Sequence, residues 1–210
     1  MRSALKITLL FLVTVACKKP SENYKIEGST TDASTGIALP YVTVAFEQKS
    51  LVNGVFTDYF LEAARATSDY SGAYKLEWKK ENITDARLLV SREFYYPQEI
   101  SIAPDDLRNQ TNLTKYLALW PKSSVLVNLQ NNSGAPIIQF NWVGTNFSCN
   151  CCTSSVRTFN NIADTVFQCN VYGGRWLKYN CVITSSSGTD FLLDSIFCQS
   201  FQTNNLVLNL

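Results

Sequence analysis

Apolar and polar residues alternate in short runs along residues 24–119, and turn-forming residues separate the runs. In residues 42–46 and again in residues 74–78, every second side chain is large and apolar. A period of two is typical of strands with one buried face, and the intervening Gly, Asp and Ser residues favour tight turns. Residues 24–119 are therefore expected to form antiparallel strands that pack into a sandwich.

The same alternation continues beyond a predicted joint at residues 120–124, although charged residues become scarce there. Apolar runs are separated by Asn-, Gly- and Ser-rich turns, and they occupy residues 125–129, 137–142, 166–171, 176–183, 192–197 and 206–210. Six or seven strands in some 90 residues favour an immunoglobulin-like sandwich over residues 120–210. The expected fold class is all-β, with two consecutive β-sandwich domains, and no helix is predicted in the mature chain.

Four short motifs follow one another in the first half: Ile26-x-Gly28, Asp32-x-x-Thr35-Gly36-x-x-Leu39-Pro40, Val42-x-Val44 and Thr67-x-Asp69-x-x-Gly72-x-Tyr74-x-Leu76. Their succession resembles the carboxypeptidase regulatory-like domain over residues 24–119. The resemblance implies a transthyretin-like β-sandwich without catalytic residues. Glycines in the turns allow positive φ, and Asp32 and Asp69 are expected to accept hydrogen bonds from turn amides. The stretch between Phe46 and Thr67 is longer than in the family, which predicts an enlarged hairpin.

The first 16 residues have the pattern of a signal peptide: two basic residues, Arg2 and Lys6, precede an uncharged apolar run that ends in small residues. The sequence Thr14-Val15-Ala16-Cys17 resembles the lipobox of bacterial lipoproteins, in which Cys17 would carry the lipid. Residues 17–23 then form a polar tether. An ordinary secretory signal cleaved nearby is the alternative. We expect a lipid anchor in the bacterial cell envelope, at the outer membrane, with the periplasmic or surface face left open.

Charge and histidine content exclude several function classes. Removal of residues 1–16 leaves 16 of the 18 basic residues against 17 acidic ones, a net charge of −1, which provides no basic surface for nucleic acid. The chain contains no histidine. It therefore lacks the usual general base, the Ser-His-Asp and Cys-His nucleophile pairs, and the commonest metal ligand. We expect no catalytic residues, no metal and no cofactor; a carboxylate-based glycosidase is the enzymatic alternative.

Six cysteines remain when Cys17 is set aside, all of them in the last third of the chain: Cys149, Cys151, Cys152, Cys169, Cys181 and Cys198. Thiolate ligation of a metal and a redox pair of Cys149 with Cys152 are two alternatives. The spacing and the absence of histidine disfavour the metal site, and the absence of a following helix pattern disfavours the redox pair. An even number in an exported chain favours structural disulfides. We expect each cysteine of residues 149–152 to pair with one of the other three, with the pairing left open.

These features favour a non-catalytic binding or structural and adhesive module, whose partner is another envelope protein or a glycan. The alternative within this class is a glycan-binding accessory lipoprotein of a surface polysaccharide system. Aromatic residues make up 12% of the chain, and exposed rings can stack on sugars. Tyr95-Tyr96 and Tyr59-Phe60, which lie near turns, are the better candidates for exposed rings, and Trp142 is expected in the core. Core packing is nevertheless favoured over sugar binding for the aromatic residues in general.

Overall fold

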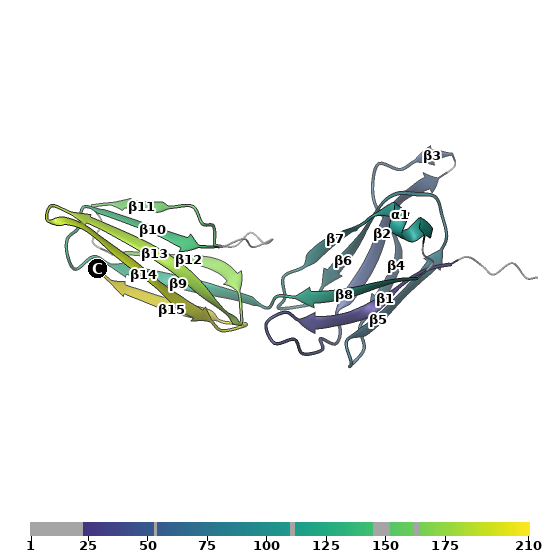
Figure 1. The fold of residues 1–210 in the computed structure, drawn as a ribbon, viewed down its shortest axis with the longest axis horizontal. Coiled ribbons are helices and arrows are strands. Elements are labelled where there is room, and N and C mark those ends of the chain that lie inside the picture. Colours follow the sequence, from purple (N-terminus) through teal and green to yellow (C-terminus); the bar gives the residue numbers. More distant parts are fainter. Residues whose placement is uncertain (1–22, 53, 110–111, 145–151, 162–163) are drawn as a thin grey trace, which may run out of the picture.

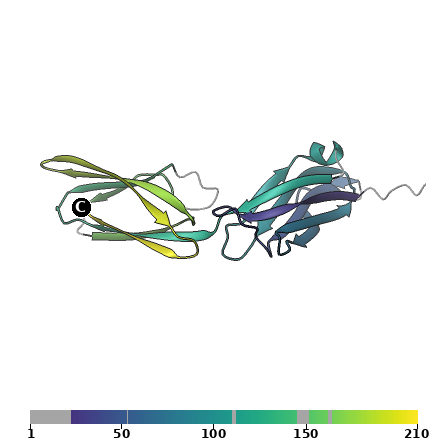
Figure 2. The ribbon, with the colours of Figure 1, turned by 60° about the horizontal axis from the view of Figure 1, so that its bottom comes forward.

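A computed structural model describes residues 23–52, 54–109, 112–144, 152–161 and 164–210. The expected signal peptide, Cys17 and nearly all of the tether fall before the first of these ranges, and Cys149 and Cys151 fall between two of them. The described chain forms two β-sandwiches placed end to end (Figures 1 and 2). No helix in the described ranges is long and apolar enough to cross a membrane.

The first sandwich consists of two sheets, one of which has β1 at its centre. That sheet has the order β5 (Ala73–Lys79), β1 (Asn23–Asp32), β8 (Asn112–Leu119). The facing sheet has the order β3 (Val55–Phe56), β2 (Thr43–Val52), β6 (Ile83–Ser91), β7 (Gln98–Ile102), and β4 (Leu61–Thr67) also pairs with β2. Between them lies a core that includes Ile26, Phe46 and Leu88, each fully buried.

The second sandwich also has two sheets, arranged around β9. One sheet has the order β12 (Asp164–Tyr172), β9 (Lys122–Gln130), β15 (Thr203–Asn209). The other has the order β11 (Arg157–Asn160), β10 (Ile137–Val143), β13 (Arg175–Ser185), β14 (Gly188–Cys198). A separate core fills this sandwich, and Trp142 lies within it with 2% of its surface exposed, as predicted.

The two sandwiches share one strand order. In the first, β1 pairs in parallel with the last strand, β8, and antiparallel with β5. In the second, β9 pairs in parallel with the last strand, β15, and antiparallel with β12. The facing sheets match as well, because β2 is flanked by β4 and β6 just as β10 is flanked by β11 and β13. The predicted all-β fold of two consecutive β-sandwiches is confirmed.

The turn chemistry of the first sandwich follows the sequence prediction. The Asp32 carboxylate accepts hydrogen bonds from the Ser34 and Thr35 amides at 2.7 and 3.1 Å. Asp69 accepts from the Ser71 and Ala73 amides at 2.8 and 2.9 Å. Gly36 and Gly72 have φ of 73° and 78°, a region that costs other residues energy. The enlarged hairpin is present too, since β2 continues past the core and pairs with β3.

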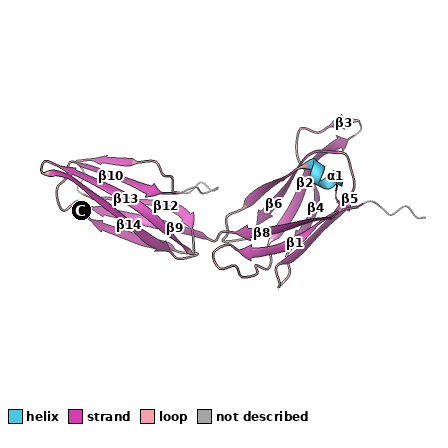
Figure 3. Cartoon of the chain, in the orientation of Figure 1, coloured by secondary structure: helices cyan, strands magenta, loops and turns pink. Residues whose placement is uncertain are grey.

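One short helix, α1 (Pro104–Asn109), joins β7 to β8 and was not predicted (Figure 3). Its sequence does carry the signals of a helix start. Proline stands at the first position and Asp105 and Asp106 occupy the first turn, where acidic residues favour the helix dipole. Six residues are too few to show an apolar period, so the pattern of strands around it concealed the helix.

Candidate functional site at the joint between the sandwiches

The segment Trp120-Pro121-Lys122 connects the sandwiches and is held by hydrogen bonds from both sides. In the β6–β7 turn of the first sandwich, the Phe94 carbonyl accepts a hydrogen bond from Lys122 N–H at 2.8 Å. Tyr96 N–H of the same turn donates to the Trp120 carbonyl at 2.9 Å. In the second sandwich, Phe201 N–H donates to the Lys122 carbonyl at 2.7 Å. The connection is therefore part of the folded structure, because its backbone groups have protein partners.

Aromatic rings from both sandwiches pack around this segment. Tyr172 of the second sandwich stacks on Trp120, with ring centroids 5.3 Å apart, and lies 5.1 Å from the ring of Tyr96. Tyr95 and Phe201 meet edge to face at 5.4 Å. Such pairs stabilise by about 0.5–1.5 kcal/mol each beyond the area that they bury. The three ring contacts and the hydrogen bond between Lys122 and Phe94 thus fix one sandwich against the other.

A cleft of about 660 Å³ opens on one side of the joint. Its walls come from the β6–β7 turn, the start of β9, β12 and the β14–β15 turn: Phe94, Tyr96, Pro97, Lys122, Ser123, Ser124, Asn170, Phe201, Gln202 and Thr203. The volume lies within the usual range for small-molecule sites. Since the walls belong to both sandwiches, the cleft exists only when they are docked.

Two phenylalanines at the cleft hold backbone conformations that suit glycine better. Phe94 has φ of 65° with 61% of its surface exposed, and Phe201 has φ of 66° with 52% exposed. The left-handed region costs an ordinary residue about 1–2 kcal/mol. Such strain persists where the surrounding structure imposes it and is concentrated at functional sites. Here it keeps two large apolar rings at the surface of a cleft instead of in a core.

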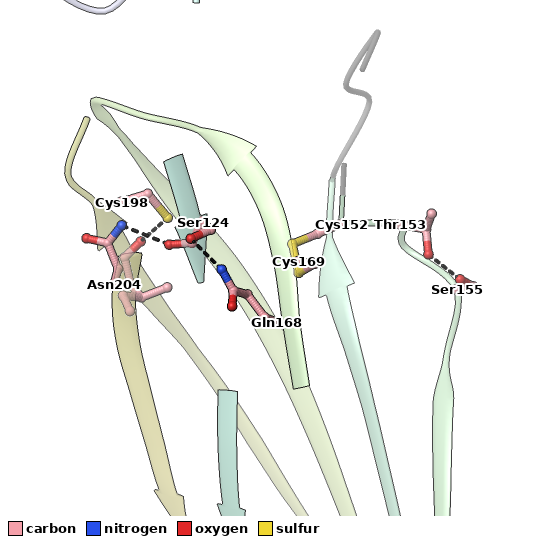
Figure 4. Close-up of a disulfide and its surroundings, with 9 residues drawn as sticks. Ser124, Cys152, Thr153, Ser155, Gln168, Cys169, Cys198 and Asn204 are labelled. Carbon is pink, nitrogen blue, oxygen red and sulfur yellow. Dashed lines mark hydrogen bonds between the residues drawn. A yellow bond between two sulfur atoms is a disulfide. The ribbon is translucent and has the colours of Figure 1, made fainter. Parts of the chain in front are cut away.

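Polar groups of the cleft are held in a network of hydrogen bonds, and Figure 4 shows the part of it around Ser124. The Ser123 hydroxyl donates to the Gln199 and Gln202 carbonyls at 2.7 and 2.9 Å, which closes the β14–β15 turn over β9. Gln168 Nε2 donates to the Ser124 hydroxyl at 3.0 Å. Asn204 Nδ2 donates to Ser123 Oγ at 2.9 Å. These bonds fix the positions of the Ser123 and Ser124 hydroxyls, so the polar groups in the floor of the cleft are preorganised.

The lining can recognise a ligand, but the described residues provide no acid–base pair for chemistry there. Among the lining side chains Lys122 is charged, and no carboxylate is present. Aromatic faces suit the apolar faces of a sugar ring or a planar group, while the amides and hydroxyls suit its polar rim. The positive charge of Lys122 favours a neutral or anionic ligand.

The cysteines differ in part from the expectation. Cys152 forms a disulfide with Cys169 of β12, with the Cα atoms 5.2 Å apart, and the Cys152 amide donates to the Asn170 carbonyl at 2.8 Å (Figure 4). One loop-to-strand disulfide is thereby confirmed. The predicted partners Cys149 and Cys151 lie outside the described ranges.

Cys181 and Cys198 are free and buried, so the prediction that they form disulfides is wrong. Across the β13–β14 pair, Cys181 lies opposite Leu192 and Cys198 lies opposite Arg175. The six residues from Arg175 to Cys181 correspond to about 20 Å of strand. Since a disulfide needs Cα atoms within about 7 Å, these two cannot bond to each other. Burial raises the pKa of each thiol to about 11, which keeps both unreactive near neutral pH.

Other site predictions have mixed outcomes. Within the described ranges no group of three or more Cys, Asp or Glu side chains could hold a metal ion. Of the candidates for exposed rings, Tyr59 is 59% exposed, whereas Tyr95 is 7% exposed and lies in the core, the placement that was favoured for the aromatic residues in general. Phe94 and Phe201 were missed because no local motif marks them; only the fold brings two distant turns together.

Comparisons with known proteins give weak likenesses. No family model matches the chain, and no curated protein matches it. Among solved structures, the DUF3823 family protein from Parabacteroides merdae is 9% identical, with 85% of this chain and 98% of that chain covered at a TM-score of 0.29. The shaft pilin SpaA from Lactobacillus rhamnosus GG is 12% identical, with 88% and 96% covered at a TM-score of 0.29.

The Bacillus anthracis TIE protein is 9% identical to this chain, with a TM-score of 0.36. The alignment covers 89% of this chain and 34% of that chain. This chain thus spans about a third of the length of that protein. None of these alignments superposes the whole fold closely, so no activity or partner is carried over from them. The chain is a tandem of two β-sandwiches with an aromatic cleft at their joint.

Proposed function

We propose that the protein is a non-catalytic, lipid-anchored envelope protein that binds an oligosaccharide in the cleft between its two sandwiches. The lipid would be attached to Cys17, at the outer membrane, and the residues before it would be removed as a signal peptide. The observation that carries the binding function is the pair of exposed rings, Phe94 and Phe201, held at positive φ beside a polar floor.

Sugar recognition fits the chemistry of this cleft better than recognition of a wholly apolar ligand does. A pyranose ring has one apolar face, which can stack on Phe94, and a rim of hydroxyls that need donors and acceptors. Asn170, Gln202 and Thr203 supply such groups at the cleft wall. Lys122 adds one positive charge, so an acidic sugar such as a uronic acid is expected to bind more tightly than its neutral counterpart.

A binding screen tests this proposal directly. The mature chain is applied to a panel of neutral and acidic bacterial oligosaccharides, and each bound glycan is titrated by calorimetry. Loss of one stacked ring in Phe94→Ala is expected to weaken binding by about tenfold. Tyr70→Ala is the matched control, because Tyr70 is 83% exposed but does not line the cleft. Equal affinity of both variants, or no bound glycan in the panel, would contradict the proposal.

The anchor needs a separate experiment. Cells that express the full chain are grown with labelled palmitate, and the protein is recovered from the membrane fraction. Label is expected on the wild-type chain and absent from Cys17→Ser, which should also leave the membrane fraction. Equal membrane association of the two chains would refute lipidation at Cys17.

A second candidate function is assembly with another copy of the chain through β14. This strand lies at the edge of its sheet, and Phe191 and Leu193 are 75% and 71% exposed on it. Two copies of an edge strand can pair antiparallel about a two-fold axis and thereby extend both sheets. Sedimentation of the mature chain tests this: a dimer that Leu193→Lys dissociates would favour assembly, and a monomer at high concentration would exclude it.

A further inference from the structure

A second exposed apolar surface lies at the opposite end of the first sandwich from the cleft. It is the tip of the β2–β3 hairpin, here called the apolar tip and defined by Leu51, Val55, Phe56 and Tyr59, which are 40%, 70%, 53% and 59% exposed. The hairpin is closed at its base, where Thr57 N–H donates to the Ser50 carbonyl at 3.1 Å. Exposed rings and aliphatic side chains gathered at one projection indicate a contact that buries them.

The apolar tip stands at the end of the sandwich where the described chain begins. Asn23, the first residue of β1, pairs with Lys79 at the end of β5. Three residues further on, the Asn82 carbonyl accepts a hydrogen bond from Leu51 N–H at 3.2 Å. Figure 1 shows β3 and the start of β1 at the same end of the molecule.

The length of the tether limits how far this end of the first sandwich can lie from the membrane. Six residue steps separate Cys17 from Asn23, and a fully extended chain covers about 20 Å in that number. If Cys17 carries the lipid, as proposed above, the apolar tip faces the bilayer surface within that reach. Rotation of the sandwich about the tether is enough to bring it into contact.

The two faces of the hairpin favour lipid over a protein groove as the occupant. Leu51 lies directly opposite Phe56, so their side chains share one face, whereas Val55 projects from the other. A groove on a protein covers one face of a strand pair. An inserted hairpin is surrounded by acyl chains on both faces, and the Tyr59 ring can keep its hydroxyl among the headgroups.

The two cations directly behind the tip are already paired, so the proposed binding rests on the apolar side chains. Lys49 forms an ion pair with Asp85 at 3.6 Å, and Arg87 forms one with Glu47 at 2.7 Å. Both cations also lie over the Phe60 ring, at 4.8 and 4.0 Å from its centroid. With each cation paired, the apolar tip should insert into neutral and anionic bilayers alike.

We propose that the apolar tip inserts into the boundary between headgroups and acyl chains of the leaflet that holds the anchor, and so orients the joint cleft away from the membrane. The inference rests on the proposed anchor at Cys17. Insertion of a few side chains to a depth of about 5–10 Å would convert a flexible attachment into a fixed orientation.

The test supplies the tether chemically, so that it does not depend on natural lipidation. The mature chain from residue 18 carries a histidine tag at its N-terminus, and vesicles of neutral phospholipid contain a nickel-chelating lipid. Because the chain itself has no histidine, the tag alone binds the vesicle. Phe56→Trp places a tryptophan at the tip, and the control Tyr70→Trp places one at the joint end of the same sandwich. The tryptophan fluorescence of each variant is compared on vesicles of plain and of brominated lipid.

Trp in Phe56→Trp is expected to lose about half of its added emission on brominated lipid, in low and high salt alike, since bromine quenches rings at the depth of insertion. The control should lose none. Equal emission of Phe56→Trp on both lipids would overturn the inference even if the palmitate experiment succeeds. Quenching that needs anionic lipid and disappears in high salt would overturn it too.

Discussion

The Tyr95 hydroxyl donates a hydrogen bond of 2.9 Å to the Asp32 carboxylate, and both side chains are buried at the joint end of the first sandwich. Asp32 is the last residue of β1 and caps the turn that follows it, and Tyr95 belongs to the turn after β6. The same carboxylate accepts hydrogen bonds from the Ser34 hydroxyl and amide. One carboxylate therefore holds together the two turns on which the second sandwich rests.

Replacement of Tyr95 by Phe is expected to destabilise the first sandwich by about 1–3 kcal/mol, because a buried carboxylate loses a donor while the ring is retained. The ring contact with Phe201 should persist. Denaturant unfolding of the mature chain measures the change. Tyr74→Phe is a control in which a phenol donates to the neutral Lys115 carbonyl instead, so it should cost less. An equal loss in both variants would mean that the Asp32 charge plays no special part.

Acid should weaken the same turn. Burial alone would raise the pKa of Asp32, but the hydrogen bonds from Ser34, Tyr95 and Thr35 prevail and hold its pKa below the ordinary value. A lowered folded pKa adds stability that is present above the unfolded pKa of about 4 and is lost as the pH falls through the folded pKa. The stability difference between wild type and Asp32→Asn should therefore shrink below about pH 4. A constant difference in unfolding experiments down to that range would refute the linkage.

Gly174 is the position at which a single methyl group should disturb the docking of the two sandwiches. Its φ is 72°, and a Cβ there would lie 2.3 Å from Ser34 Cβ in the other sandwich. Gly174→Ala must push Ser34 away from Asp32, and we expect a change in the angle between the sandwiches by small-angle X-ray scattering. Gly134→Ala is the matched control, since Gly134 has φ of 67° with no neighbour within 4 Å.

Both alanines carry the backbone cost of positive φ, which is about 1 kcal/mol, so the contact with Ser34 and a milder one with Ser200 Oγ at 3.3 Å separate them. Scattering curves of Gly134→Ala should match wild type. If Gly174→Ala also matches wild type in both scattering and stability, the sandwiches are not held against each other as the structure shows.

Phe94 offers a test of whether its strain serves binding. Asparagine adopts the left-handed region more readily than phenylalanine, and the Lys122 amide bonds to the backbone carbonyl, which any residue supplies. Phe94→Asn should therefore raise the free energy of unfolding by about 1 kcal/mol while weakening oligosaccharide binding. Thermal melts and calorimetric titration on the same samples provide both numbers. A variant that is less stable would show that the ring is there for packing.

Local features of the fold were predictable from the sequence, because they depend on near neighbours. The alternation in residues 74–78 gives a strand whose Tyr74, Leu76 and Trp78 are all buried. The turns at Asp32 and Asp69 follow from short side chains that reach amides two to four residues away.

Features that depend on distant contacts were not predictable. Tyr95 looked like an exposed turn residue, yet its partner Asp32 lies 63 positions earlier in the chain. The two sandwiches share a strand order, but their sequences share no motif that reveals it. A topology requires apolar side chains at certain positions and does not specify which apolar residue stands there. The cleft arises where turns of both sandwiches meet, and the sequence pattern carries no information on that meeting.

The cysteines give the last prediction, since composition alone suggested that all six form disulfides. In the native mature chain, Cys181 and Cys198 should resist an alkylating reagent at neutral pH, because burial raises the pKa of each thiol to about 11. After unfolding without reductant both should react, whereas Cys152 and Cys169 should stay linked in the peptide map. Reduction of that link before unfolding should cost the second sandwich about 2–4 kcal/mol. Recovery of Cys181 or Cys198 in a disulfide-linked peptide would contradict the free thiols, and rapid alkylation of the native chain would contradict their burial.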